Sequence, residues 1–263
     1  SMIWLLPWDT HHGVRHWPVV TWALMLANIL VFLLMPGEPA RLEAAFNEYG
    51  LVAGDWHWYQ FITSAFMHGD VFHLVGNMFF LWVFGDNVED AFGPLGFLLL
   101  YALGGLAGDL LWIQANSTML PSIGASGCIS AIAGAYGALF FNRSIDLKVI
   151  LLVFPIYTLH LRAFWVLLLF FGVDTWMTLE GKGAIGEDHG GVNFVAHGAG
   201  FLFGLALGLA GLAHGVMRRY THVPGGHPWW GYWPASLEEK ARLAALRARQ
   251  LERLREQARK SSA

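Results

Sequence analysis

Six apolar segments, each close to the length that crosses a lipid bilayer, constrain this chain more than any other feature. A spanning helix needs about 20 predominantly apolar residues. Because 56% of the 263 residues are hydrophobic and only 13% are charged, the composition indicates a membrane protein. We therefore expect an all-α membrane protein with a six-transmembrane-helix bundle. The predicted spans are 17–36, 70–89, 94–114, 126–142, 163–180 and 191–214.

Charge divides the chain into three predicted parts: an N-terminal segment (1–16), a membrane domain (17–215) and a basic tail (216–263). The tail holds ten Lys and Arg against four Asp and Glu, whereas the rest of the chain holds six against fifteen. Beside a hydrophobic body, such a tail is explained by a cytoplasmic position that faces anionic membrane lipid. We expect no nucleic-acid partner. A capping box at 236–239 predicts that part of the tail is helical.

The distribution of basic residues between the spans predicts the orientation of the bundle. With six spans, Lys182 and one arginine lie on one side, whereas four basic residues and the tail lie on the side of both termini. Both termini are therefore predicted to be cytoplasmic. The charge distribution does not identify the membrane; as a separate expectation, we assign the chain to a bacterial inner (plasma) membrane. The first span is long for a signal peptide and is interpreted as a retained anchor. The run 149–161 contains Pro155 and is too short to span, so we expect a buried or interfacial connection.

Ser126 opens the fourth span in a Gly124-Ala-Ser-Gly motif. Backbone N–H groups and the positive end of the helix dipole at such a position suit an oxyanion. The motif alone is weak, because small residues are also common where membrane helices pack. Two stripes of small residues at four-residue spacing predict close packing of spans four and six. The stripes comprise Ser126, Ser130, Gly134 and Ala138, and Ala196, Gly200, Gly204 and Gly208.

His197 directly follows the first residue of the second stripe. If the stripes pack, its imidazole faces the Ser126 hydroxyl near the outer surface, and the pair can act as nucleophile and general base. The alternative is a core histidine that hydrogen-bonds across helices. His73 and Asn77 share one face of span two and are candidate oxyanion donors, or else interhelical hydrogen-bonding groups that hold the bundle together.

Metal and cofactor chemistry is not indicated. The twelve histidines do not show the spacing of zinc peptidases, and the single cysteine, Cys128, excludes an intramolecular disulfide. Asp109 and Asp174 lie within apolar spans, and neither has a clear claim to complete a catalytic triad. We expect no cofactor and no metal ion.

Taken together, these motifs resemble the rhomboid family of intramembrane serine proteases over about residues 17–214. Each motif is weak alone, but their order, spacing and spans agree as a set. The matching text is His68-Gly-Asp-Val-Phe-His73-Leu-Val-Gly-Asn77, Gly124-Ala-Ser-Gly127 and Ala196-His197-Gly-Ala-Gly200.

The resemblance implies a serine endopeptidase with a Ser126–His197 dyad, which cleaves transmembrane proteins in or near their membrane segments. It also implies oxyanion assistance from His73 and Asn77, and a role in water handling for His68. One departure is Gln60: many relatives carry Trp-Arg where this chain has Tyr-Gln, so an arginine contact that would brace the first outer loop is missing. Two other functions stay open, a catalytically silent client-binding or degradation adaptor and a small multipass transporter.

Overall fold

The computed structural model describes residues 3–9, 17–116, 119–141, 144–151, 154–179 and 194–213. The predicted tail helix lies outside the described residues, as does the whole segment between the fifth and sixth predicted spans (181–190). The side chains of 3–9 and of Asp174 are likewise not described.

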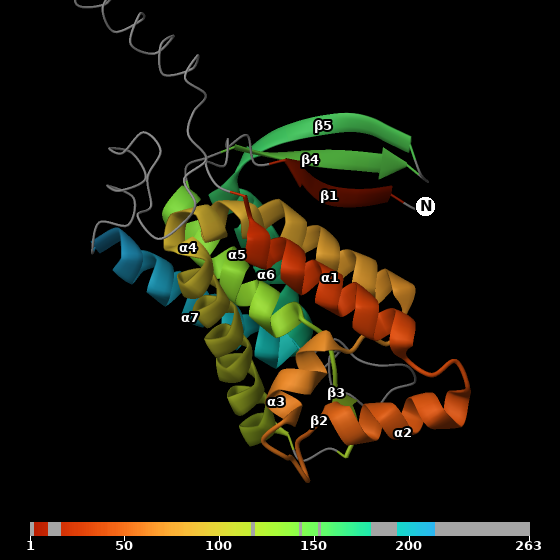
Figure 1. Cartoon of the computed structure of the whole chain (residues 1–263). Coiled ribbons are helices and arrows are strands. Elements are labelled where there is room, and N and C mark those ends of the chain that lie inside the picture. Colours follow the sequence, from red (N-terminus) through yellow and green to blue (C-terminus); the bar gives the residue numbers. More distant parts are fainter. Residues whose placement is uncertain are drawn as a thin grey trace, which may run out of the picture. The chain divides into compact units, whose positions relative to one another are not determined.

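Apolar helices occur at all six predicted positions and pack into one bundle (Figure 1). The second and third form a single long element that bends at Gly93, whose φ of 77° is left-handed and favours glycine. Pro94 follows at once, as the first residue of the second half, where proline is tolerated. The bundle comprises α1 (Val19–Leu34), α4 (Val71–Ala115), α5 (Ser126–Phe140), α6 (Ala163–Leu179) and α7 (Phe194–Ala213).

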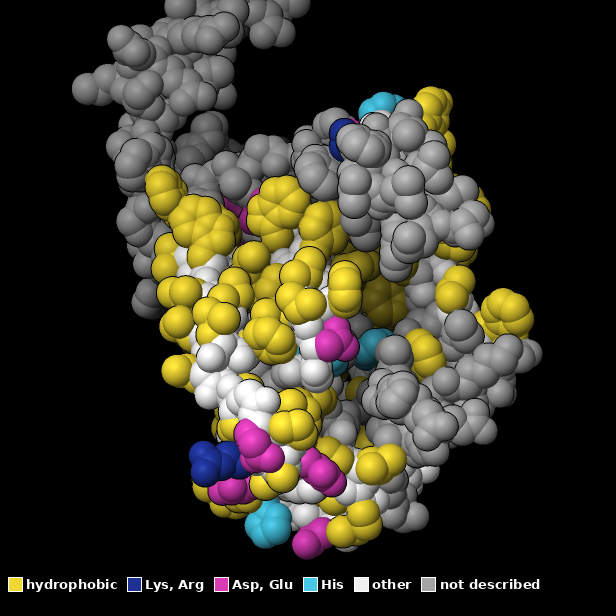
Figure 2. Space-filling view, turned by 90° about the vertical axis from the view of Figure 1, so that its right-hand side faces the viewer, with side chains coloured by type: hydrophobic (Ala, Val, Ile, Leu, Met, Phe, Trp, Pro, Cys, Tyr) yellow, Lys and Arg dark blue, Asp and Glu magenta, His cyan; other side chains and the backbone are white. Residues whose placement is uncertain are grey.

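Among the described residues, α4 and α7 are long and apolar enough to cross a membrane by length and composition, whereas α1 and α5 are shorter apolar helices. Large hydrophobic side chains are exposed on the bundle, including Phe72 (85% exposed), Leu34 and Leu202. Figure 2 shows such side chains covering the middle of one face, while acidic side chains gather at one end. This surface suits a lipid environment better than water.

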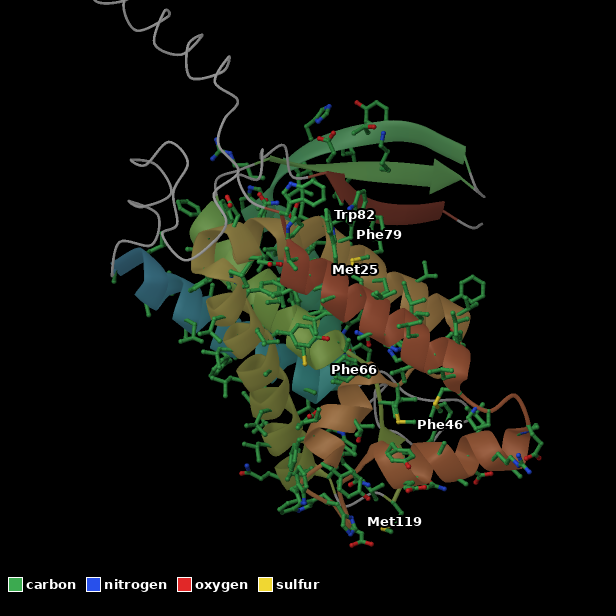
Figure 3. All side chains as sticks on the ribbon, viewed as in Figure 1. Met25, Phe46, Phe66, Phe79, Trp82 and Met119 are labelled. Carbon is green, nitrogen blue, oxygen red and sulfur yellow. The ribbon has the colours of Figure 1, made fainter. Side chains whose placement is uncertain are left out.

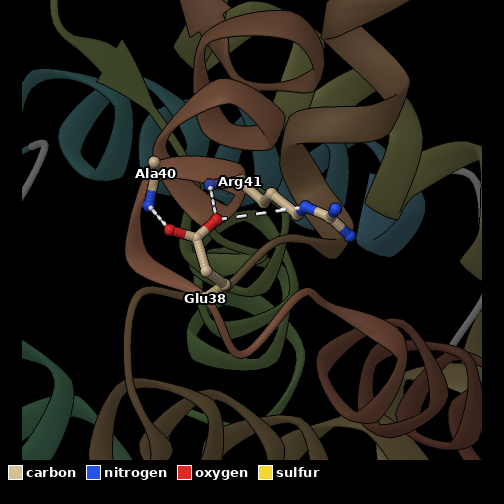
Figure 4. Close-up of polar contacts among 3 residues, drawn as sticks. All are labelled: Glu38, Ala40 and Arg41. Carbon is tan, nitrogen blue, oxygen red and sulfur yellow. Dashed lines mark hydrogen bonds and ion pairs between the residues drawn. The ribbon is translucent and has the colours of Figure 1, made fainter.

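Between α1 and α4, the chain forms short elements at one end of the bundle. Glu38 is the N-cap of α2: its carboxylate accepts hydrogen bonds from the backbone N–H groups of Ala40 (3.1 Å) and Arg41 (3.0 Å) (Figure 4). A two-residue strand then pairs with the segment before α5. These elements are α2 (Pro39–Tyr49), β2 (Leu51–Val52), α3 (Gln60–Thr63), the 3₁₀ helix η1 (Ser64–Phe66) and β3 (Pro121–Ser122).

A three-stranded antiparallel sheet lies beside the helices, in the order β1-β4-β5 (Figure 1). Its strands are β1 (Ile3–Asp9), β4 (Ser144–Leu151) and β5 (Phe154–Arg162). The expectation of an all-α chain omits this sheet. The described residues of the run 149–161, which we expected to be a buried or interfacial connection, belong to the paired strands β4 and β5. Ile145, Asp146 and Leu147 of β4 are all buried, whereas Lys148 is only partly buried. A short, largely apolar run of this kind does not distinguish a buried strand from another buried segment, which is why the sequence did not indicate the sheet.

The hydrophobic core lies where α4 and α5 meet, around Phe84 and Tyr136. Their rings pack edge to face with the ring centroids 5.0 Å apart. On another side of α4, Phe79 and Trp82 lie toward β1 (Figure 3). The sheet therefore lies next to α4 on this side, while β5 runs into α6 without a loop.

Candidate active site

The closest helix packing brings α5 against α7 through residues that lack large side chains. A Cβ placed on Gly204 would overlap the Ala131 carbonyl oxygen, and one on Gly200 would overlap the Gly127 carbonyl oxygen. We call this contact the α5–α7 seam. It comprises Gly127, Ala131, Gly134 and Ala138 of α5 with Ala196, Gly200, Gly204 and Gly208 of α7.

The seam confirms that the two small-residue stripes pack together, with one difference in register. The α7 stripe is the predicted one, but near the start of α5 the contacts fall on Gly127 and Ala131, one residue after Ser126 and Ser130. The helices therefore meet backbone to backbone along the glycines. The serines lie beside the contact line rather than on it.

Ser126 and His197 lie at the same end of the seam. Gly127 lies against Ala196, since a Cβ on Gly127 would be 3.8 Å from the Ala196 Cβ. Ser126 directly precedes Gly127, and His197 directly follows Ala196. Because adjacent Cα atoms along a chain are about 3.8 Å apart, Ser126 and His197 both lie close to this contact. Both side chains are partly buried. Ser126 is also the first residue of α5, where backbone N–H groups have no partner within the helix.

Gly124 joins this end of the seam to α4. Its φ of 120° is one that L side chains rarely adopt, and a Cβ there would lie 2.7 Å from His73 Nε2 and 3.6 Å from Asn77 Nδ2. The glycine thus lets the chain pass directly over both polar groups of α4.

His73 and Asn77 are held on one face of α4 by the start of that helix. Asp70 caps it by accepting hydrogen bonds from the backbone N–H groups of Phe72 (2.7 Å) and His73 (2.9 Å). One turn later, Asn77 is 9% exposed and its Nδ2 lies 2.9 Å from His68 Nε2. The His68 and His73 rings meet edge to face at 4.9 Å. Burial, with the nearby His73 as a smaller cause, lowers the pKa of His68 to about 4, so this ring is neutral at pH 7.

Two residues not predicted as part of the site fix the loops around it. The Ser64 carbonyl accepts hydrogen bonds from the backbone N–H groups of Met67 (3.2 Å) and Gly124 (2.9 Å), so it ties the His68 loop to the loop before α5. Gln60 is 2% exposed; its Oε1 accepts from the His57 N–H (2.9 Å) and its Nε2 donates to the Glu48 carbonyl (3.1 Å). The segment between α1 and α4 is therefore braced by the amide side chain of Gln60. In the sequence, the one signal for this role of Gln60 was the presence of Tyr59-Gln60 at the position of the expected Trp-Arg pair.

The structure thus gathers the predicted site residues at one end of the bundle. Gly124 contacts the α4 pair, and the start of α5 meets the start of α7 beside Ser126 and His197. Figure 2 shows histidine side chains in a recess within the hydrophobic band. Asp109 has no hydrogen bond or ion pair with other described residues, and among those residues no group of three or more His, Cys, Asp or Glu could hold a metal ion.

Comparison with known proteins agrees with the arrangement of the motifs. The family model of the Rhomboid domain matches residues 55–214. Rhomboid protein 1, mitochondrial, of Saccharomyces cerevisiae is 31% identical over 144 residues, which are 52% of this chain and 40% of that protein. Rhomboid protease GluP of Bacillus subtilis is 33% identical over 143 residues, 51% of this chain and 27% of that protein. YdcA of the same bacterium is 30% identical over 125 residues, 47% of this chain and 63% of its own length.

This chain covers less than two thirds of the length of each of these relatives. The family model, in contrast, covers more than half of the chain and includes every motif on which the resemblance rested. Rhomboid proteins are helical integral membrane proteins, which accounts for the exposed apolar side chains on the bundle. The chain therefore belongs to the rhomboid family.

Proposed function

We propose that this chain is an intramembrane serine endopeptidase that hydrolyses peptide bonds in or near the transmembrane segments of other membrane proteins. In this proposal Ser126 is the nucleophile and His197 its general base. His73 and Asn77, with the backbone N–H groups at the start of α5, stabilise the oxyanion. No cofactor takes part.

The steps follow from the roles of these groups. His197 takes the proton of the Ser126 hydroxyl as its Oγ attacks the scissile carbonyl carbon, and the carbonyl oxygen becomes an oxyanion. The His73 and Asn77 donors stabilise that charge in a site shielded from bulk water. His197 then gives its proton to the leaving amine. A water molecule, deprotonated by the same imidazole, hydrolyses the acyl-enzyme and restores Ser126.

The observation that carries the proposal is the left-handed Gly124, which lets His73 and Asn77 lie against the chain two residues before Ser126. A residue that only started a packed helix would need neither this backbone conformation nor two polar groups against it. The end of the α5–α7 seam supplies His197 at the same place. Nucleophile, base and oxyanion donors are then available from three separate elements.

The finer membrane topology belongs to the same proposal. We infer six spans, formed by α1, the two halves of α4, α5, α6 and α7, with both termini cytoplasmic. The support is the excess of basic residues on the side of the termini. On this topology Ser126, at the start of α5, lies toward the outer face, and substrates are cut near their outer membrane boundary. We assign the protein to a bacterial inner membrane; its named relatives also include mitochondrial and chloroplast proteins.

The experiment compares the native chain with Ser126→Ala in detergent, using a single-span model substrate and a fluorophosphonate probe. We expect native cleavage and labelling, and at least about a 1,000-fold loss of turnover in Ser126→Ala, since Ala retains the helix but not the nucleophile. Ser130→Ala, one turn further along α5, is the matched control and keeps both activities. Cleavage by Ser126→Ala near the native rate contradicts the mechanism.

The alternative, a silent client-binding or degradation adaptor, predicts a different result. An adaptor binds the model substrate but neither cuts it nor reacts with the probe, and Ser126→Ala leaves binding unchanged. Retention of both Ser126 and His197 in the sequence favours the enzyme.

A further inference from the structure

His68 is the most buried polar side chain beside the candidate site, at 1% exposed. It does not lie on a helix but in the loop between η1 and α4, which the Ser64 carbonyl ties to the loop containing Gly124. Its side chain is therefore fixed by burial and by two connected loops. None of the catalytic steps described above uses it.

The contact between His68 and Asn77 determines the hydrogen-bonding state of the imidazole. The 2.9 Å contact joins His68 Nε2 to Asn77 Nδ2. An amide nitrogen carries only hydrogens to donate, so Nε2 must be the acceptor and the ring must be neutral, with its proton on Nδ1. Burial keeps the ring neutral in the neutral pH range. Of the charged groups that face it, His73 also favours the neutral ring, whereas Asp70 opposes it.

Accepting this hydrogen bond has a consequence for the other side of the amide. The Asn77 NH₂ group has two hydrogens in one plane, and the contact with His68 commits one of them. The same nitrogen lies 3.6 Å from the position that a Cβ on Gly124 would occupy. Fixing one N–H toward His68 fixes the amide plane, and with it the remaining donor beside Gly124.

We infer that His68 is a positioning residue, whose Nε2 accepts a hydrogen bond from Asn77 and so fixes the second amide N–H for the oxyanion formed at Ser126. This inference rests on the proposed function, and it assigns His68 an orienting role where the family resemblance implied water handling. Without the acceptor, the amide of Asn77 rotates and its donor is oriented for only part of the time. The loss then appears in the transition state and hence in kcat rather than in substrate binding.

The test uses two substitutions at His68. His68→Leu fills a similar space without an acceptor, and we expect kcat to fall by about 10- to 100-fold with KM changed less than about threefold. His68→Gln places an amide oxygen where Nε2 was, and we expect it to recover most of the native kcat. His57→Leu, at an exposed histidine of the first outer loop, is the control and keeps native kinetics.

A double-mutant cycle with Asn77→Ala separates positioning from a structural role. If His68 acts through Asn77, His68→Leu has no further effect on kcat once Asn77 is alanine, although thermal unfolding still registers both changes. An equal loss of kcat in the two backgrounds overturns the inference, as does a His68→Gln variant as slow as His68→Leu. An inactive native chain refutes the proposed function and this inference together, whereas an active native chain with additive losses refutes only the inference.

Discussion

The α5–α7 seam and the three-stranded sheet both join distant parts of the chain through their backbones, but they leave very different room for change. In the seam, a Cβ on Gly204 meets the carbonyl group of Ala131, which cannot move without shifting the whole of α5. In the sheet, backbones are held about 4.8 Å apart by hydrogen bonds, and side chains alternate between two faces. A change on the outer face of the sheet therefore meets little resistance.

This difference follows from what each region positions. The seam sets the separation of the segments that carry Ser126 and His197, so a shift of a few tenths of an ångström is transmitted to both. The sheet lies beside the bundle and leads, through β5, into α6. We expect substitutions in the seam to affect folding and activity together, and substitutions in the sheet to affect stability alone.

The largest expected effect is that of Gly204→Val. Its side chain would overlap the Ala131 backbone, and we expect a loss of stability of more than about 3 kcal/mol, with little folded protein recovered. Thermal unfolding in detergent measures it. Gly198→Ala is the matched control on the same helix: nothing lies within 4 Å of its Cβ, and we expect a change of less than about 1 kcal/mol. If Gly204→Val unfolds like Gly198→Ala, the seam is not a tight contact.

The sheet gives the second prediction. Leu147 is 1% exposed and packs into the core, so Leu147→Ala should cost about 2–4 kcal/mol through lost contacts and a cavity. Lys148→Ala, on the other face of the same strand and only partly buried, should cost less, about 1 kcal/mol. Turnover per folded molecule stays native in both variants. A change in kcat for folded Leu147→Ala would show that the sheet, too, positions the site.

The difference between the two regions also explains what could be predicted from sequence. The seam was predicted because small residues at four-residue spacing, visible within a single segment, indicate a helix face that packs closely against another helix. Its register was not, since Ser126 and Gly127 are both small and either could lie on the contact line. The sheet was missed because β1 pairs with a strand more than 130 residues away, and no local pattern records that partner.

Within the site, residue types could be predicted but backbone conformation could not. Ser126, His197, His73 and Asn77 stand out as polar residues in apolar helices. The left-handed φ of Gly124 and the Gln60 brace depend on how two loops meet, which spacing along the chain does not determine. The acceptor role of His68 likewise depends on which atom of Asn77 faces it.

Substitution of a buried side chain that accepts hydrogen bonds should lower stability less than a substitution in the seam and more than one at the surface. Glu89 is 3% exposed and accepts hydrogen bonds from Val20 N (2.9 Å), Thr21 N (2.8 Å) and Thr21 Oγ1 (2.7 Å), which fixes the start of α1 against α4. Glu89→Gln removes one acceptor and the charge, and we expect a loss of about 1–3 kcal/mol.

The control for Glu89→Gln is the same substitution at a solvent-exposed cap. Glu38→Gln, at the start of α2, should cost about 0.5 kcal/mol or less, because water replaces the lost hydrogen bond. Urea titrations of both variants in the same detergent measure the difference. Equal losses of stability would mean that the hydrogen bonds of the buried Glu89 contribute no more than those of the exposed Glu38.

The smallest expected effect is one of pH, and it separates the His68 loop from the seam, which contains no titratable group. The folded chain keeps His68 neutral down to a pKa of about 4, whereas the unfolded chain protonates this residue near its ordinary pKa of about 6.5. Between those values the unfolded state binds more protons, so stability falls as the pH is lowered from 6.5 toward 4. We expect this residue to contribute on the order of 1 kcal/mol to the loss by pH 5. His68→Gln, which cannot titrate there, should show a correspondingly flatter stability curve from pH 7 to 5. If native chain and His68→Gln lose stability in parallel, His68 is not held neutral, and the imidazole cannot be the fixed acceptor that orients Asn77.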